Sequence, residues 1–134
     1  QARKLRELID GRTDSVPVLI LSGGETTVEV KGRGCGGRNL EYLLALALEL
    51  KSLPDTWAIA CDTDGIDGCS QAAGAILTPD TLARADSAGL DASACLADND
   101  AGGFFQRLGD TVITGPTRTN VNDFRAIACF VPTG

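Results

Sequence analysis

Apolar and polar residues follow one another in patterns that predict strands separated by helices. Residues Val16–Leu21 form an apolar run of strand length, which predicts a strand buried on both faces. Residues Thr26–Lys31 alternate valines with charged residues, as in a strand with one face in water, and the short link predicts an antiparallel hairpin. Residues Arg38–Ser52 carry leucines almost all round, which predicts a buried helix ended by Pro54.

The rest of the chain continues this alternation after a predicted helix tail at residues 3–11. The further predicted strands are Trp57–Cys61, Gly74–Thr78, Val112–Thr114 and Ala126–Val131, and the further predicted helices are Pro79–Ala88, Asp91–Ala97 and Phe104–Leu108. Strands interleaved with helices predict an α/β layered domain with a mixed β-sheet flanked by helices. With 134 residues, we expect a single domain at residues 1–134.

Charge and hydropathy exclude several classes of partner. The net charge is -6 and no run of Lys or Arg is present, which argues against nucleic acid and anionic membranes. The longest apolar stretch, Leu40–Leu50, is too short to span a bilayer and contains two glutamates. We see no secretory leader. The chain lacks Met and opens inside a helical pattern, so we expect a fragment of a larger protein, with residues 1–12 as an interdomain helix tail.

Five cysteines and no histidine limit the chemistry further. An odd number of cysteines without a C-x-x-C pair favours buried, reduced thiols in a cytoplasmic protein. Without histidine, a Cys/His zinc site and a Ser-His or Cys-His nucleophile cannot be built from this chain alone.

A glycine cluster at residues 32–37 runs directly into the leucine-rich helix. Free N–H groups at a helix start, next to flexible glycines, favour an anion, and Arg38 adds a fork of donors suited to phosphate or carboxylate. The spacing of Gly32, Gly34 and Gly37 also matches the dinucleotide fingerprint, with Asp62 after the next strand. The preceding strand is charged on one face, which weakens that interpretation. The remaining alternative is that the glycine cluster binds no ligand and forms a tight loop that packs the helix against the sheet.

Two polar loops complete the candidate site. Asp62, Asp64 and Asp67 follow a buried strand, and carboxylates there could hold Mg²⁺, although Asp and Gly are also ordinary turn formers. The polar residues of the loop 115–123 often hydrogen-bond only to local backbone groups. Among them, Asn120 is the strongest candidate for a binding role. Glu25, after a Gly-Gly turn, is a further candidate.

Five segments together resemble the MOFRL domain, the C-terminal domain of class II glycerate kinases, a family often labelled hydroxypyruvate reductase. They lie in family order and are Leu21–Val28, Gly36–Asn39, Thr63–Gly68, Ala72–Ala75 and Gly115–Asp123. The chain departs from the family pattern at three positions, where Leu40 stands for Gln, Gln71 for Asp and Arg118 for Gly.

The resemblance implies a glycerate 2-kinase that transfers phosphate from ATP, with Mg²⁺, to D-glycerate and gives 2-phosphoglycerate. It also implies a missing N-terminal Rossmann-like domain that brings an essential lysine and closes an interdomain cleft. By the same resemblance the catalytic candidates are Arg38, Asp64 and Glu25. Substrate or phosphate binding is expected from Asn120, Gly36, Gly37, Asn39 and Thr117. The metal ligands stay open, with Asp64 and Asp67 as the candidates.

Two other functions stay open at this point. The first is an NAD(P)H-dependent hydroxypyruvate reductase, which the glycine fingerprint would have to support. The second is a non-catalytic dimerisation or regulatory domain, for which a homodimer would be the sign.

Overall fold

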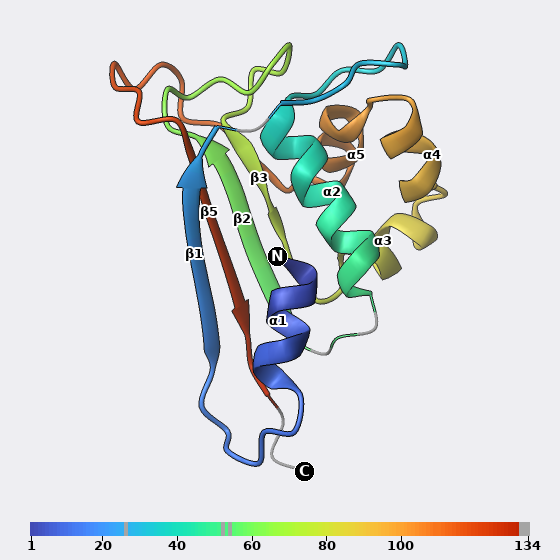
Figure 1. Ribbon diagram of the computed structural model, residues 1–134. Helices are drawn as coiled ribbons and strands as arrows, with labels where there is room; N and C mark the ends of the chain where they lie inside the picture. The colour runs from blue at the N-terminus through green and yellow to red at the C-terminus, as the bar shows by residue number, and fades with distance from the viewer. Residues whose placement is uncertain (26, 52, 54, 132–134) are drawn as a thin grey trace.

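The structure is a computed structural model that describes residues 1–25, 27–51, 53 and 55–131, and it consists of a sheet with helices on one face (Figure 1). The strands are β1 (Val18–Gly24), β2 (Thr56–Asp62), β3 (Gly74–Leu77), β4 (Thr111–Val112) and β5 (Asp123–Cys129). The helices are α1 (Ala2–Ile9), α2 (Arg38–Leu50), α3 (Thr81–Ser87), α4 (Ala92–Ala97) and α5 (Ala101–Leu108). The predicted α/β layered class is confirmed.

The sheet has the strand order β1-β5-β2-β3-β4, and every pairing among the described residues is antiparallel. The prediction of a mixed sheet was therefore wrong. Because β5 lies between β1 and β2, those two strands run in the same direction without touching each other. Helix α2 connects β1 to β2, so the three elements resemble a β-α-β unit in which β5 lies between the two strands.

The predicted hairpin after β1 does not form. Thr26 lies outside the described residues, and residues 27–31 form no strand. They are held instead by Asn99, whose side-chain oxygen accepts hydrogen bonds from the N–H groups of Lys31 and Gly32, both at 2.7 Å. The Asn99 amide in turn donates to the Glu29 carbonyl at 3.2 Å. The alternation of valines and charges thus marks an extended loop.

The core lies between the sheet and the helices. Leu40, Leu43 and Leu44 of α2 are fully buried, and so are Phe104 and Phe105 of α5. The two phenylalanine rings meet edge to face at 5.2 Å between centroids. Helix α2 ends at Leu50, and the expected stop at Pro54 lies outside the described residues. The leucine pattern thus predicted this helix correctly, because its apolar surface is covered by the sheet and the other helices.

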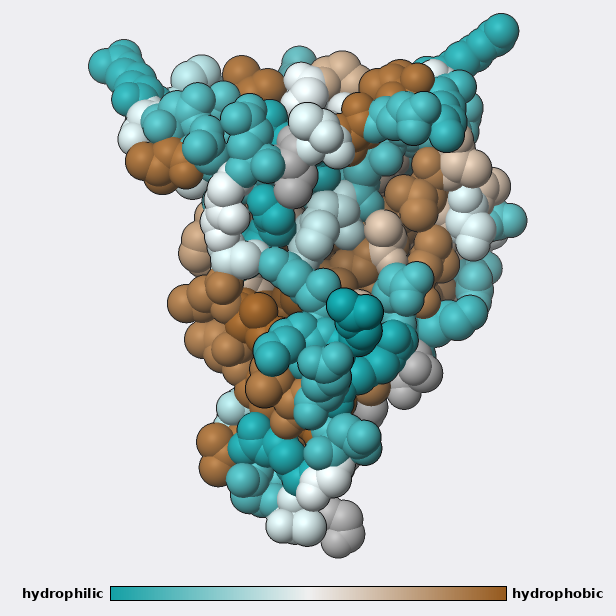
Figure 2. Space-filling model, viewed as in Figure 1, coloured by the Kyte–Doolittle hydropathy of each residue, from teal (hydrophilic) through white to brown (hydrophobic). Residues whose placement is uncertain are grey.

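The opposite face of the sheet is apolar and uncovered. Leu19, Leu21 and Trp57 are 61%, 62% and 45% exposed. The strand register places Leu21, Ala126, Ile59 and Ile76 side by side across four strands. Figure 2 shows hydrophobic residues gathered on the side of the molecule where β1 lies. An antiparallel sheet that faces water usually alternates apolar with polar residues, and this face does not. No helix among the described residues is long and apolar enough to cross a membrane.

Candidate functional site

The loops that carry the predicted site residues meet at one edge of the sheet. The register pairs Gly24, at the end of β1, with Asp123, at the start of β5, and Asp123 in turn with Asp62, at the end of β2. Glu25 follows Gly24 directly, and α2 begins at the same edge, at the top of Figure 1. Binding residues lie disproportionately often on loops that a rigid scaffold positions, as the sheet positions these.

Arg38, the first residue of α2, is the centre of this edge. Its Nε donates to Asp123 at 2.9 Å and its Nη2 to Asp62 at 2.6 Å. Its Nη1 lies 3.8 Å from the Glu25 carboxylate, which is 64% exposed. The hydrogen bond that Arg38 donates to Asp123 is the main cause that raises the pKa of Arg38, so its charge is permanent. Two buried carboxylates therefore orient a guanidinium whose third nitrogen is directed to the surface.

The carboxylates that hold Arg38 are themselves buried. Asp123 also accepts from the Asn39 side chain at 2.8 Å and from Arg125 at 3.3 Å, and Arg125 lies over the Tyr42 ring at 5.1 Å. Burial raises the pKa of Asp62 above its ordinary value. Charges taken out of water cost free energy that only good geometry repays. Such a cluster at a loop edge is typical of a functional site.

Asp67 fills the anion-binding position that the sequence placed at the start of α2. Its carboxylate accepts hydrogen bonds from the backbone N–H groups of Asn39 at 3.2 Å and Leu40 at 2.8 Å, and from the Asn39 amide at 3.2 Å. Asp67 is 1% exposed, and burial raises its pKa. A Cβ at Gly37 would lie 2.4 Å from the Asp67 carboxyl carbon, so only glycine fits there. Asp67 thus caps the helix and is not placed to ligate a metal.

Replacing Asp67 by alanine is expected to lower the free energy of unfolding by about 2–3 kcal/mol, because two backbone donors and an amide lose a buried acceptor. Asp67→Asn is the matched control and should cost about half as much, since it keeps one oxygen. Urea denaturation measures both variants. A loss below about 0.5 kcal/mol in Asp67→Ala would show that water replaces the cap.

The acidic loop and the loop before β5 are joined through Thr63. Its N–H donates to the Asn122 carbonyl at 3.0 Å, and its hydroxyl accepts from the Val121 N–H at 2.9 Å. The Thr117 N–H donates to the Asp64 carbonyl at 3.2 Å, and its hydroxyl donates to the Thr63 carbonyl. The two loops therefore form one unit beside Arg38.

The structure divides the predicted site residues into two groups. Glu25 and Asn120 are exposed at the rim and Asp64 is half-buried. Asp64 accepts from the Ile66 N–H and Asn120 from the Asn122 N–H, as turn residues do. Asn39 is fully buried, and its amide donates to Asp67 and Asp123, so its side chain does not face the rim. The Thr117 hydroxyl donates its hydrogen bond to the Thr63 carbonyl in the neighbouring loop.

The sequence offered Asp62 only to a dinucleotide or to Mg²⁺, and Asp123 only as part of the polar loop 115–123, yet both position Arg38. Their position in the sequence could have indicated this role, because Asp62 and Asp123 each stand at the end of a strand, next to a loop that contains a candidate site residue. What the sequence could not show is that β5 lies between β1 and β2 and brings both aspartates to one arginine.

The glycine fingerprint lacks the context that a dinucleotide site needs. No strand among the described residues directly precedes Gly32, and the segment from Glu25 to Gly37 separates β1 from α2. A fingerprint loop follows its strand without such an insertion. Gly32 and Gly34 instead pack the loop closely against Asp98 and Asp100, and Gly37 packs against Asp67.

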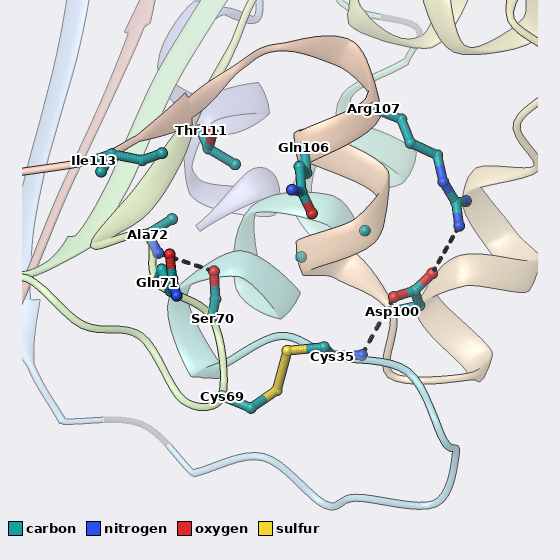
Figure 3. Close-up of a pocket in the computed structure, with 12 residues that line it drawn as sticks. Cys35, Cys69, Ser70, Gln71, Ala72, Asp100, Gln106, Arg107, Thr111 and Ile113 are labelled. Atoms are coloured by element: carbon teal, nitrogen blue, oxygen red, sulfur yellow. Dashed lines mark hydrogen bonds and ion pairs between the residues drawn. A yellow bond between two sulfur atoms is a disulfide. The ribbon is translucent and has the colours of Figure 1, made fainter.

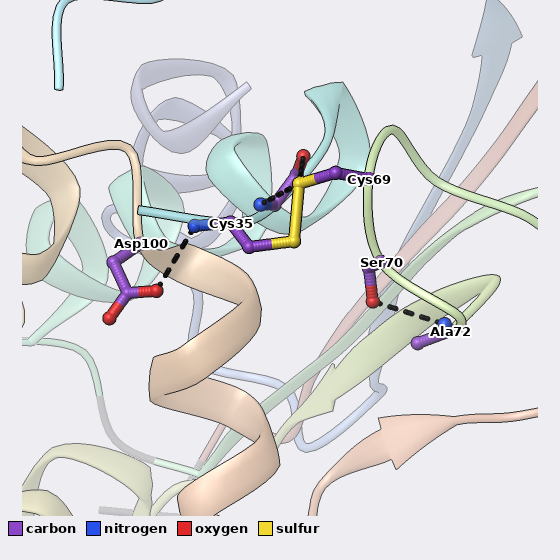
Figure 4. The surroundings of a disulfide bond; sticks show 6 residues. Cys35, Cys69, Ser70, Ala72 and Asp100 are labelled. Atoms are coloured by element: carbon purple, nitrogen blue, oxygen red, sulfur yellow. Dashed lines mark hydrogen bonds between the residues drawn. A yellow bond between two sulfur atoms is a disulfide. The ribbon is translucent and has the colours of Figure 1, made fainter. Parts of the chain in front are cut away.

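The cysteines differ from the expectation of reduced, buried thiols. Cys35, in the glycine loop, and Cys69, after the acidic loop, form a disulfide (Figure 4). The thiols of Cys61 and Cys95 are half-buried, and that of Cys129 is buried. Local spacing did not predict the pair, because 34 residues separate its members.

Two clefts adjoin this edge. One of about 340 Å³ lies against Arg38, Gly36 and Gly37. The other, of about 590 Å³, lies against α5 and β4, with Asp100 and Arg107 paired at 3.8 Å on its wall (Figure 3). Cys69 lines both clefts.

Comparisons with known proteins agree with one another. The model of the MOFRL family matches residues 18–123. A protein of Agrobacterium vitis named putative hydroxypyruvate reductase is 54% identical over 115 residues, which cover 84% of this chain and 26% of that protein. The D-glycerate 2-kinase of Thermotoga maritima is 41% identical over 107 residues, covering 80% of this chain and 26% of that enzyme. The crystal structure of glycerate kinase from Thermotoga maritima superposes with a TM-score of 0.80 at 35% identity, covering 97% of this chain and 31% of the other. The chain thus spans about a quarter of the length of the relatives that it matches.

Proposed function

Because this chain belongs to the MOFRL family, we propose that it forms one wall of the active site of a glycerate 2-kinase, which transfers phosphate from ATP to D-glycerate. The observation that carries the proposal is the arrangement of Arg38, which Asp62 and Asp123 hold with its Nη1 toward the rim. Relatives at 37–44% identity are named glycerate kinase or glycerate 2-kinase.

Arg38 would bind an oxygen of the transferring phosphate or of the glycerate carboxylate. Phosphoryl transfer depends mainly on positioning and on cations that stabilise the charge of the transition state. A guanidinium held by two buried carboxylates needs no reorganisation at that moment. Asn120, at the exposed rim, would donate a hydrogen bond to the substrate, and the Gly36–Gly37 backbone would border the phosphate.

The rim residues fit Mg²⁺ bound together with nucleotide phosphates. Among the described residues, no group of three Asp, Glu, His or Cys side chains could hold a metal by itself. Mg²⁺ in kinases needs only one or two carboxylates, since phosphates and water supply the other ligands. Glu25 and Asp64 provide such carboxylates, and bound Mg²⁺ would neutralise phosphate charge. Either carboxylate could instead orient the attacking hydroxyl.

The rest of the active site would come from an N-terminal Rossmann-like domain of the same, longer chain, with an essential lysine. The length of the relatives supports this, because this chain covers 26% of the Thermotoga maritima enzyme. The uncovered apolar face of the sheet also fits a longer protein, whose further elements would bury Leu19, Leu21 and Trp57. The chain alone would be inactive. We further propose a cytoplasmic enzyme, since glycerate and ATP are cytoplasmic metabolites.

The full-length protein tests this function directly. With ATP, Mg²⁺ and D-glycerate it should form 2-phosphoglycerate and ADP. The name of the Agrobacterium vitis relative makes hydroxypyruvate reduction the competing activity. The control is therefore NADH with hydroxypyruvate and no ATP, which should give no loss of NADH absorbance. NADH oxidation without any glycerate phosphorylation would replace the kinase proposal by the reductase.

A further inference from the structure

The disulfide Cys35–Cys69 joins the two loops that border the proposed phosphate site. Cys35 lies in the glycine loop just before α2, and Cys69 follows the acidic loop that caps α2 through Asp67. The two Cα atoms are 5.9 Å apart, within the range of an ordinary disulfide. The bond thus connects the loops at the base of the cleft that holds Arg38.

The backbone alone brings the two sulfur atoms together. The Cys35 carbonyl accepts from the Gly102 N–H at 2.8 Å, and the Cys35 N–H donates to Asp100 at 3.2 Å, so Cys35 is fixed to the start of α5. A Cβ at Gly68 would lie 2.3 Å from the Gly36 carbonyl oxygen, because the loops cross without space between them. Two thiols at these positions would stay adjacent after reduction, so the bond can form and break without rearrangement of the fold.

The sulfur of Cys69 occupies one donor of the proposed phosphate loop. The Gly36 N–H donates to this sulfur at 3.1 Å. Cys69 is exposed and lines both clefts, and Figure 3 shows the disulfide at the edge of the larger one. The bond is therefore open to a small molecule from solvent, and it lies next to the Gly36 amide.

The other thiols are much less suited to exchange. Burial raises the pKa of Cys61 to about 11 and also raises the pKa of Cys95 above its ordinary value. Cys129 is 1% exposed. Exchange needs an accessible thiolate, so it is confined to Cys35 and Cys69.

We propose that Cys35 and Cys69 form a thiol–disulfide exchange site for low-molecular-weight disulfides and thiols, and that reduction removes the covalent link between the glycine loop and the acidic loop, which lets the glycine loop move toward a phosphate. In the oxidising direction the Cys69 thiolate attacks one sulfur of a small disulfide, breaks its S–S bond and releases one thiolate, which takes up a proton. The Cys35 thiolate then attacks the Cys69 sulfur and displaces the second small thiolate. The protein loses two electrons and two protons, and the small disulfide gains them as two thiols.

The test uses the full-length protein equilibrated in glutathione buffers of graded ratio and then alkylated with a maleimide for mass spectrometry. Two thiols should disappear together, in a single transition, as the buffer becomes oxidising. Cys69→Ser should lose this transition, whereas Cys95→Ser should keep it. A constant number of alkylated thiols over the whole range, or an unchanged transition in Cys69→Ser, would overturn the exchange site.

The link to phosphate rests on the proposed function and has two readouts. Hydrogen exchange of a peptide that contains residues 32–40 should be faster in the reduced protein, and this holds whether or not glycerate is phosphorylated. Reduced enzyme should show at least a threefold lower KM for ATP or glycerate than oxidised enzyme, and Cys69→Ser should be insensitive to glutathione. Equal hydrogen exchange in both states would refute release of the loop. Absence of any kinase activity would refute only the proposed function.

Discussion

Replacing Arg38 by alanine in the full-length protein is expected to lower kcat for glycerate phosphorylation by about 100-fold or more, with a smaller change in KM. The reason is that the guanidinium is oriented in advance by Asp62 and Asp123, so the charge lost is one placed for the transition state. Coupled detection of ADP over a range of glycerate concentrations gives both constants.

Arg33→Ala is the matched control, because Arg33 lies exposed in the same loop and should keep normal turnover. Arg38→Lys keeps a positive charge without the planar fork and should fall between the two. Thermal unfolding of each variant separates a lost site from a lost fold. Normal kcat in Arg38→Ala would leave Arg38 as a structural residue only and would remove the main support for the site.

The second large effect is on stability. Replacing Asp123 by alanine should lower the free energy of unfolding by about 3–5 kcal/mol, because it removes the buried carboxylate that Arg125 contacts and one of the two buried carboxylates that hold Arg38. Arg38, Arg125 and Asn39 all donate to this carboxylate, whose side chain is fully buried. Urea denaturation followed by circular dichroism measures the loss.

Two further variants serve as controls for Asp123→Ala. Asp123→Asn keeps an acceptor oxygen and should be less destabilising than alanine. Asp86→Ala, on the exposed side of α3, should change stability by less than about 0.5 kcal/mol. Equal stability of Asp123→Ala and Asp86→Ala would mean that the cluster around Arg38 does not hold the loops together.

Local patterns predicted most elements of this fold and missed those decided by distant partners. The leucines of α2 and the apolar runs of β1 and β2 predict their own elements, because burial sets the spacing of apolar residues along each of them. Residues 27–31 have the alternation of a strand, but β1 pairs with β5 and not with them. Asn99 binds this segment instead. Register and strand order are properties of the whole chain.

The candidate site shows the same division. Arg38 could be singled out because a cation in the first turn of a helix opposes the helix dipole and needs another reason. Asp67 could not be recognised as the cap, because 27 residues separate it from the N–H of Leu40 that it accepts. The disulfide was missed for a similar reason, since crossing loops bring Cys35 and Cys69 together.

A crystal structure of the full-length protein with Mg²⁺, a non-hydrolysable ATP analogue and D-glycerate tests the central claim most directly. It should show a phosphate or glycerate oxygen within hydrogen-bond distance of Arg38 Nη1, with Glu25, Asp64 and Asn120 around the same ligands. Ligands bound elsewhere, with the Arg38 edge facing solvent, would contradict the account.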